Sequence, residues 1–216
     1  MARNVAIGIQ QYNELIEKNY FYIDKTDFIK EWWENGDSVT LITRPRRFGK
    51  TLNMSMVEQF FSTDYANRGD LFEGLSIWNE EKYRKIQGTY PVIILTFANV
   101  KEKNYPDTRK KICQMLAELY TSHSFLLDSQ ALEAGDKEFF RRISVDMDDV
   151  DATMAIHYLS KFLYRYYGNL EVVTTTSDKY ATSFGFTEEE VFAALEECAL
   201  GGEKEEVKHW YDGFIF

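Results

Sequence analysis

The stretch VTLITRPRRFGKTLNMSMVEQFF, residues 39–61, joins an apolar run, a basic loop and an amphipathic segment. Residues 39–43 are almost all apolar or β-branched, as in a strand that is buried on both faces of a parallel sheet. After the loop of residues 44–49, apolar side chains recur on one face of a predicted helix: Leu52, Met56, Val57, Phe60 and Phe61. Strand, loop and helix in this order predict a phosphate-binding unit, because the N-terminal end of a helix favours negative charge.

The loop ends in Gly49-Lys50-Thr51, the last three positions of the P-loop pattern G-x-x-x-x-G-K-[ST]. In that pattern backbone N–H groups hold phosphate oxygens, the lysine reaches the outer phosphates, and the hydroxyl binds the metal ion. We therefore expect the N–H groups of residues 47–51 and Lys50 to contact phosphates, and Thr51 to contact a metal ion. Arg44 replaces the first glycine of the pattern, so a strict match fails.

Three arginines, Arg44, Arg46 and Arg47, stand in this loop of a chain whose formal net charge is −10. A Gly-Lys-Thr triplet also occurs at ordinary helix starts, but the flanking strand and helix and these cations favour phosphate binding. The arginines have two uses that the sequence leaves open: they stabilise phosphate charge, in this subunit or a neighbouring one, or they form salt bridges with surplus carboxylates. The predicted nucleotide-binding residues are Arg44, Pro45, Arg46, Arg47, Phe48, Gly49, Lys50, Thr51 and Leu52.

Composition indicates a folded, acidic globular protein. The 216 residues are 44% hydrophobic and 16% aromatic, enough for one substantial core with a smaller appended part. The negative charge argues against broad nonspecific attachment to nucleic acid or to an anionic membrane.

Cys113 and Cys198 lie far apart in the sequence, without the spacing of a disulfide framework or a zinc site, which predicts reduced, packed thiols. No apolar stretch approaches the length of a membrane span, and we expect a cytoplasmic protein.

Beyond the loop, the sequence predicts a second strand and several helices. Residues 91–97, PVIILTF, form a short apolar β-branched run that is typical of a buried strand parallel to residues 39–43. Apolar periodicity and capping residues predict helices from Asp107 to about His123, over residues 136–143, from Ala155 to Tyr166 with Gly168 as the cap, and from Thr187 to about Gly201.

Three groups of polar residues have a structural and a functional interpretation. Asp24 and Asp27 are expected to cap a helix, with a nucleotide contact as the alternative. The acidic run of residues 145–151, VDMDDVD, is expected to cap a helix rather than bind a cation. The three histidines lack the spacing of metal ligands, which argues against a metal-dependent hydrolase.

The run TRPRRFGKTLNMSM, together with YFYIDKTDFI at residues 20–29 and HWYDGFIF at residues 209–216, resembles the predicted AAA-ATPase-like family of bacterial proteins. In that family arginine and proline replace glycine in a degenerate Walker A loop, so Arg44 fits the family's form of the loop. The resemblance implies a P-loop ATPase domain that binds ATP with magnesium, often followed by a restriction-type nuclease domain. The implied fold is α/β, a P-loop NTPase-like parallel sheet flanked by helices.

The resemblance is interrupted after Gly168. Related proteins continue into a buried strand that ends in acidic residues, the Walker B segment, and later into a sensor strand. Here residues 169–174 follow directly, and they resemble a segment that lies beyond both strands in related proteins. Relative to those proteins, several dozen residues are therefore absent. They are either deleted from the gene or left out of the sequence. The resemblance thus divides the chain into an incomplete P-loop NTPase-like domain, residues 1–168, and a mainly helical segment, residues 169–216.

Two functions from different classes follow. The first is an ATP-binding P-loop domain, which would be an ATPase only if the acidic strand is present in the full-length protein. Hydrolysis needs an acid at the end of a strand next to the loop, and neither Asp146 nor Asp178 has that context, so no catalytic residue is assigned. The second is a non-catalytic interaction or regulatory module of a nucleic-acid-processing protein. The partners considered are a nucleotide, further copies of the chain, and nucleic acid bound through a C-terminal domain outside this sequence.

Overall fold

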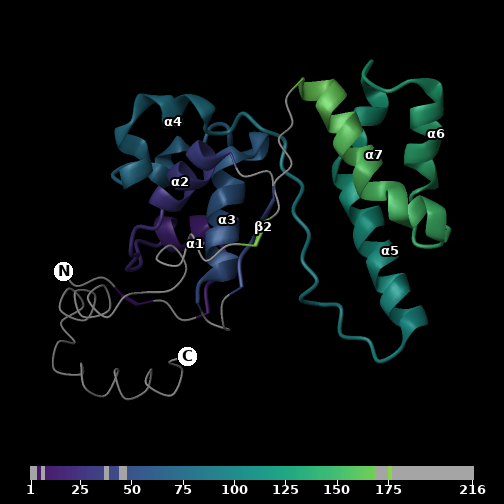
Figure 1. Cartoon of the computed structure of the whole chain (residues 1–216), viewed down its shortest axis with the longest axis horizontal. Helices are drawn as coiled ribbons and strands as arrows, with labels where there is room; N and C mark the ends of the chain where they lie inside the picture. The colour runs from purple at the N-terminus through teal and green to yellow at the C-terminus, as the bar shows by residue number, and fades with distance from the viewer. Residues whose placement is uncertain (1–3, 6–7, 37–38, 44–47, 169–174, 177–216) are drawn as a thin grey trace. The chain divides into compact units, whose positions relative to one another are not determined.

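The computed structural model describes residues 4–5, 8–36, 39–43, 48–168 and 175–176 (Figure 1). The chain divides into two compact units: unit 1 is Met1–Thr89 with Val172–Phe216, and unit 2 is Tyr90–Glu171. The described part of both units is mostly helical. The domain division expected at residue 168 stays a prediction, because residues 169–174 and 177–216 lie outside the described residues, as do the helix expected from Thr187 and the thiol of Cys198.

Unit 1 is built from short helices around an aromatic core. Tyr12 stacks on Phe72 with ring centroids 5.3 Å apart, and Phe60 meets the same ring edge-on at 5.1 Å. All three rings are fully buried, and such pairs stabilise a core beyond the area that they bury. The helical elements are α1 (Tyr12–Glu17), α2 (Asp27–Asn35), α3 (Lys50–Phe61), α4 (Glu81–Ile86) and the 3-10 turns η1 (Thr63–Tyr65), η2 (Gly69–Phe72) and η3 (Ser76–Asn79).

The first segment of unit 1 is hydrogen-bonded near its end to the last turn of α3. The N–H of Gly88 donates a hydrogen bond to the carbonyl of Phe60 at 2.8 Å. Gly88 has a φ of +68°, and a Cβ atom at this position would lie 2.3 Å from the Cα atom of Ala66. Only glycine therefore fits this contact without moving the backbone.

A short parallel ladder carries the predicted strand that precedes the phosphate loop. β1 (Thr40–Leu41) pairs with β2 (Thr175–Thr176), with Thr40 opposite Thr175 and Leu41 opposite Thr176. The strand is therefore found, but the expectation that both its faces are buried is wrong, because Val39 and Leu41 are 48% and 52% exposed. Among the described residues this ladder is the whole sheet, so the larger parallel sheet stays a prediction.

Residues 91–97 correct a second expectation. They form no strand in the described structure, and Ile94 and Phe97 are 43% and 58% exposed. A β-branched apolar run becomes a strand only where a neighbouring backbone supplies hydrogen-bond donors and acceptors. No described segment pairs with residues 91–97, so these residues form no strand there despite their preference for extended backbone.

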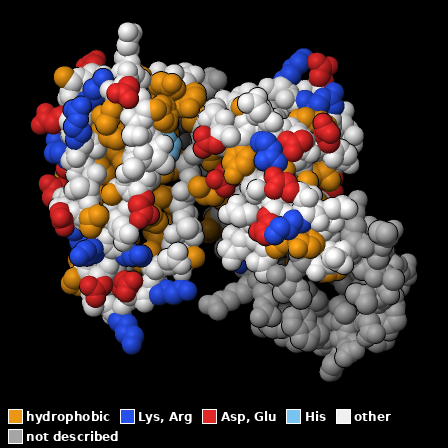
Figure 2. Space-filling view, turned by 180° about the vertical axis from the view of Figure 1, so that it is seen from behind, with side chains coloured by type: hydrophobic (Ala, Val, Ile, Leu, Met, Phe, Trp, Pro, Cys, Tyr) orange, Lys and Arg blue, Asp and Glu red, His pale blue; other side chains and the backbone are white. Residues whose placement is uncertain are grey.

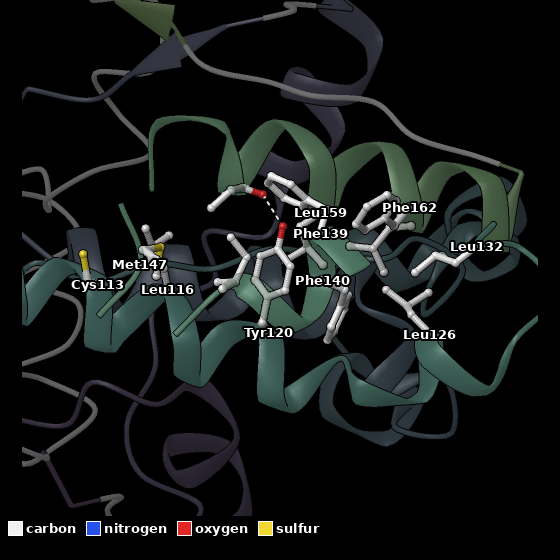
Figure 3. Packing of buried hydrophobic residues seen from close by; sticks show 13 residues of the cluster. Cys113, Leu116, Tyr120, Leu126, Leu132, Phe139, Phe140, Met147, Leu159 and Phe162 are labelled. Atoms are coloured by element: carbon white, nitrogen blue, oxygen red, sulfur yellow. Dashed lines mark hydrogen bonds between the residues drawn. The ribbon is translucent and has the colours of Figure 1, made fainter. Parts of the chain in front are cut away.

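Unit 2 packs two long helices, one shorter helix and a 3-10 turn around one core (Figure 3). The elements are α5 (Tyr105–Ser122), η4 (Ser124–Asp128), α6 (Ala134–Arg142) and α7 (Asp149–Tyr167). The hydroxyl of Tyr120 on α5 donates to the carbonyl of Ala155 on α7 at 2.8 Å, which satisfies a polar group in the middle of this core. In Figure 2 charged side chains of both signs border the hydrophobic ones over this unit.

The helix ends of unit 2 largely match the expected caps. Gly168 ends α7 in the left-handed conformation, with φ +74°. The start of α5 differs from the expectation: the cap is Asn104, whose side chain accepts from the N–H of Asp107 at 2.9 Å, and Pro106 lies inside the first turn. Proline is tolerated there because the first N–H groups of a helix have no partner within the helix. No described helix is long and apolar enough to cross a membrane.

Candidate functional site

The N-terminal end of α3 is shaped by Gly49. This residue is the N-cap of the helix, with φ 69° and ψ 9° in the left-handed region, which glycine adopts without steric cost. Its carbonyl accepts the N–H of Asn53 at 2.9 Å and so closes the first turn. Glycine supplies no capping side chain, and the first turn contains no acidic residue. The N–H groups and the helix dipole therefore favour an anion at this end.

The structure brings together the second half of the predicted site. Lys50 and Thr51 open α3 directly after Phe48 and Gly49, and Leu52 follows them in the first turn. Lys50 is partly buried, whereas Thr51 is exposed and its hydroxyl makes no hydrogen bond to a described residue. Arg44, Pro45, Arg46 and Arg47 lie outside the described residues. The two open uses of the arginines therefore stay open.

A buried polar network holds α1 against α3. The hydroxyl of Ser55 accepts the N–H of Tyr12 and donates to Gln11 Oε1, each at 3.1 Å. Gln59, which is fully buried, donates from Nε2 to Ser55 Oγ and to Asn13 Oδ1, each at 3.0 Å. Buried amides and hydroxyls require such partners, so the network fixes the position of the helix that begins at Gly49.

Sequence reasoning missed Ser55 and Gln59. The sequence predicts an apolar face of α3, and Met56, Phe60 and Phe61 of this face are buried. The sequence does contain one indication: Ser55 and Gln59 are four residues apart, which places them next to each other on one face of the helix. That spacing alone does not distinguish a solvated pair from a pair that is buried under α1.

Aromatic contacts hold the other side of α3. Trp32 and Trp33 of α2 both contact the ring of Phe61, with centroids 5.4 Å and 5.5 Å away. The indole N–H of Trp32 donates to Thr40 Oγ1 at 3.0 Å, which ties α2 to β1. The strand before the loop and the helix after it are thus both anchored on α2.

Asp24 joins the start of α2 to η3. One carboxylate oxygen accepts the N–H and the hydroxyl of Thr26 at 2.8 Å and 2.6 Å, and the other accepts the N–H of Ser76 at 2.7 Å. Asp27 accepts the hydroxyl of Ser76 at 2.9 Å. These contacts support the structural interpretation of both carboxylates. The capping detail differs from the expectation, because the N-cap of α2 is Thr26 and it makes no side-chain capping bond.

The acidic run of residues 145–151 is used for capping and ion pairs. Asp148 is the N-cap of α7 and accepts the N–H of Asp151 at 2.7 Å. Asp151 receives two hydrogen bonds of 2.9 Å from Arg142, and this guanidinium lowers the pKa of the Asp151 carboxyl. No group of three or more acidic, histidine or cysteine residues in the described part could hold a metal ion. The cap that the sequence predicts in this run is thus found at Asp148.

Glu58 on α3 provides a prediction about pH. Burial, and to a smaller extent the carboxylate of Asp64, raise the pKa of Glu58 above its ordinary value. The Glu58 carboxyl therefore binds its proton more tightly in the folded state than in the unfolded state. The protonated carboxyl stabilises the folded state at low pH, and this stabilisation is lost as pH rises through the folded pKa of Glu58. We expect Glu58→Gln to raise the free energy of unfolding at about pH 7 and to have little effect near pH 4. Urea unfolding at both pH values measures this, and an equal effect at both would contradict it.

Comparison with known proteins gives one family and one curated relative to report. The family model described as Predicted AAA-ATPase matches residues 6–176. The relative is described as an uncharacterized protein in the vnfD 5' region of Azotobacter chroococcum mcd 1, and it is 23% identical over 259 residues. The match covers 98% of this chain and 48% of the relative, so the chain spans about half the length of that protein. No solved structure matches significantly.

The alignment with this relative is longer than the 216 residues of the chain. The relative therefore carries residues inside the aligned region that have no counterpart here, in keeping with the expected absence of several dozen residues. The family match includes the loop, α3 and all of the described helices. Since the family model covers well over half of the sequence, the chain belongs to the predicted AAA-ATPase family.

Proposed function

We propose that the protein binds ATP with magnesium at the N-terminal end of α3. The observation that carries this proposal is the conformation of Gly49, which opens a helix of 12 residues with Lys50 and Thr51 in its first turn. Membership of an ATPase-like family supports it. The proposal includes the P-loop fold, in which β1 is one strand of a parallel sheet that precedes the loop.

Each residue of the site has a chemical role in this proposal. The N–H groups at the start of α3 bind phosphate oxygens, Lys50 neutralises the outer phosphates, and Thr51 offers its hydroxyl to the metal ion. Arg44, Arg46 and Arg47 add positive charge beside the phosphates. Phe48 precedes Gly49 within the loop, Leu52 follows in the first turn of α3, and Pro45 restricts the backbone of the loop.

Hydrolysis is left out of the proposal. It needs an acidic side chain at the end of a strand next to the loop, to complete the metal site and orient water. Asp146 lies in an exposed turn before α7 and follows no strand. The site therefore supports binding without assigning a catalytic base.

Binding is tested with a fluorescent ATP analogue in the presence of magnesium. Lys50→Ala removes the charge on the outer phosphates, and we expect the dissociation constant to rise at least tenfold, which is about 1.4 kcal/mol. Lys85→Ala is the matched control, because this lysine is 72% exposed in the same unit and forms an ion pair with Glu81, which is 70% exposed. Thr51→Ala should weaken binding in magnesium and not in EDTA.

Two results would overturn the proposal. The first is the absence of binding by the intact chain at millimolar nucleotide, which would favour the interaction or regulatory module instead. The second is an equal loss of binding in Lys50→Ala and Lys85→Ala, with both variants folded by circular dichroism.

A further inference from the structure

One side chain of α2, that of Trp32, contacts both elements that flank the predicted phosphate loop. Its indole N–H donates to Thr40 Oγ1 of β1 at 3.0 Å, and its ring meets that of Phe61 of α3 edge-on, with centroids 5.4 Å apart. Thr40 precedes the loop of residues 44–49 and Phe61 follows it. A single residue of unit 1 therefore joins the strand before the loop to the helix after it.

The contacts of Trp32 lie at the ends of β1 and α3 that are remote from the loop. Thr40 is the first residue of β1, and Phe61 is the last residue of α3. When a strand and a helix are joined at these ends, the separation of the two elements is fixed. The loop then connects two fixed ends, and a binding site on such a loop needs less reorganisation when its ligand arrives.

The support beneath Trp32 is itself held firmly. Trp33 stacks on the other partner, the ring of Phe61, with centroids 5.5 Å apart and an angle of 24° between the rings. Phe28 and Ile29 of α2 are buried in the core of unit 1. Near the end of α2, Glu34 accepts the hydroxyl of Tyr83 on α4 at 2.7 Å. The helix that carries Trp32 is thus a fixed reference for both β1 and α3.

We propose that Trp32 is a positioning residue for the phosphate site, and that its hydrogen bond to Thr40 keeps β1 at the distance from α3 at which the loop binds nucleotide. This inference rests on the proposed function. Without the bond the strand samples further positions, and the apparent dissociation constant rises as the binding-competent fraction falls. By linkage, bound nucleotide must in turn stabilise the bond.

The first test separates this hydrogen bond from packing. Thr40→Val keeps the shape of the side chain and removes the acceptor, so the dissociation constant of a fluorescent ATP analogue with magnesium should rise about two- to tenfold. Thr40→Ser retains the hydroxyl and should restore the affinity of the parent chain. Tyr83→Phe is the matched control, because it removes a hydrogen bond between the same helix and α4, which does not flank the loop. It should leave the dissociation constant unchanged.

The second test is the exchange of the Trp32 indole proton with solvent, followed by nuclear magnetic resonance. The signal is identified by its loss in Trp32→Phe. Saturating nucleotide should slow this exchange in the parent chain, because binding and the bond stabilise each other. The same nucleotide concentration should have a smaller effect in Lys50→Ala, in which the proposed phosphate contact is removed.

The outcomes distinguish this inference from the function on which it rests. A parent chain that binds no nucleotide overturns both. If the parent binds, three results overturn the inference alone: equal affinities of the parent and Thr40→Val, an equal loss in Thr40→Val and Tyr83→Phe, or a Thr40→Ser variant that binds no better than Thr40→Val. Exchange of the indole proton that nucleotide leaves unchanged also overturns it.

Discussion

Replacing Phe162 by alanine should lower the free energy of unfolding of unit 2 by about 3–5 kcal/mol. Phe162 on α7 is fully buried, and its ring meets those of Tyr158, Phe139 and Phe140 at centroid distances of 5.9, 6.5 and 6.4 Å. It therefore joins α7 to α6 in the centre of the core. Alanine removes this contact and leaves a cavity that two packed helices can only partly close.

Urea unfolding followed by circular dichroism at 222 nm measures this loss, because unit 2 is largely helical. Tyr164→Ala is the control on the same helix: its ring is 54% exposed, so a change within about 0.5 kcal/mol is expected. Similar losses in the two variants would mean that the ring of Phe162 is not the centre of the core.

Replacing Asp24 by alanine should lower the stability of unit 1 by about 2–4 kcal/mol. The carboxylate accepts three hydrogen bonds, from the N–H and hydroxyl of Thr26 and from the N–H of Ser76. Hydrogen bonds to a charged acceptor are the strong ones, and their loss leaves partly buried N–H groups without a partner. Asp24→Asn keeps the shape and should have an intermediate effect.

Tryptophan fluorescence during urea unfolding follows this change, because Trp32, Trp33 and Trp78 lie in unit 1 and unit 2 contains no tryptophan. Asp27→Ala is the matched control, since Asp27 is exposed and accepts one bond from Ser76, and it should cost clearly less. An equal loss in both variants would refute the central role of Asp24. Loss of nucleotide binding by the folded Asp24→Ala protein would instead favour a nucleotide contact.

The helices and their ends could be predicted from the sequence where the signal is local. Gly49 and Gly168 mark a helix start and a helix end because each needs a left-handed backbone, and a glycine next to an apolar period indicates that need. Asp148 caps α7 through a bond that spans three residues. Such features depend on neighbours along the chain, which the sequence shows directly.

The features that depend on distant segments could not be predicted in this way. The run of residues 91–97 has the composition of a buried strand, but pairing requires a second backbone that the run itself does not specify. Ser55 and Gln59 look like solvent-facing positions of α3, and they are buried because α1, about forty residues earlier, covers them with matching polar groups. At the site, the sequence predicted Gly49, Lys50 and Thr51 and missed what holds their helix in place.

The bond between Gly88 and Phe60 gives α3 a second use. At one end of this helix lies the proposed phosphate site, and at the other end the carbonyl of Phe60 accepts the N–H of Gly88, one residue before the first segment of unit 1 ends at Thr89. A helix of 12 residues is a stiff rod about 18 Å long. The distance between the helix start at Gly49 and the point where Gly88 is held is therefore set by one rigid element of unit 1.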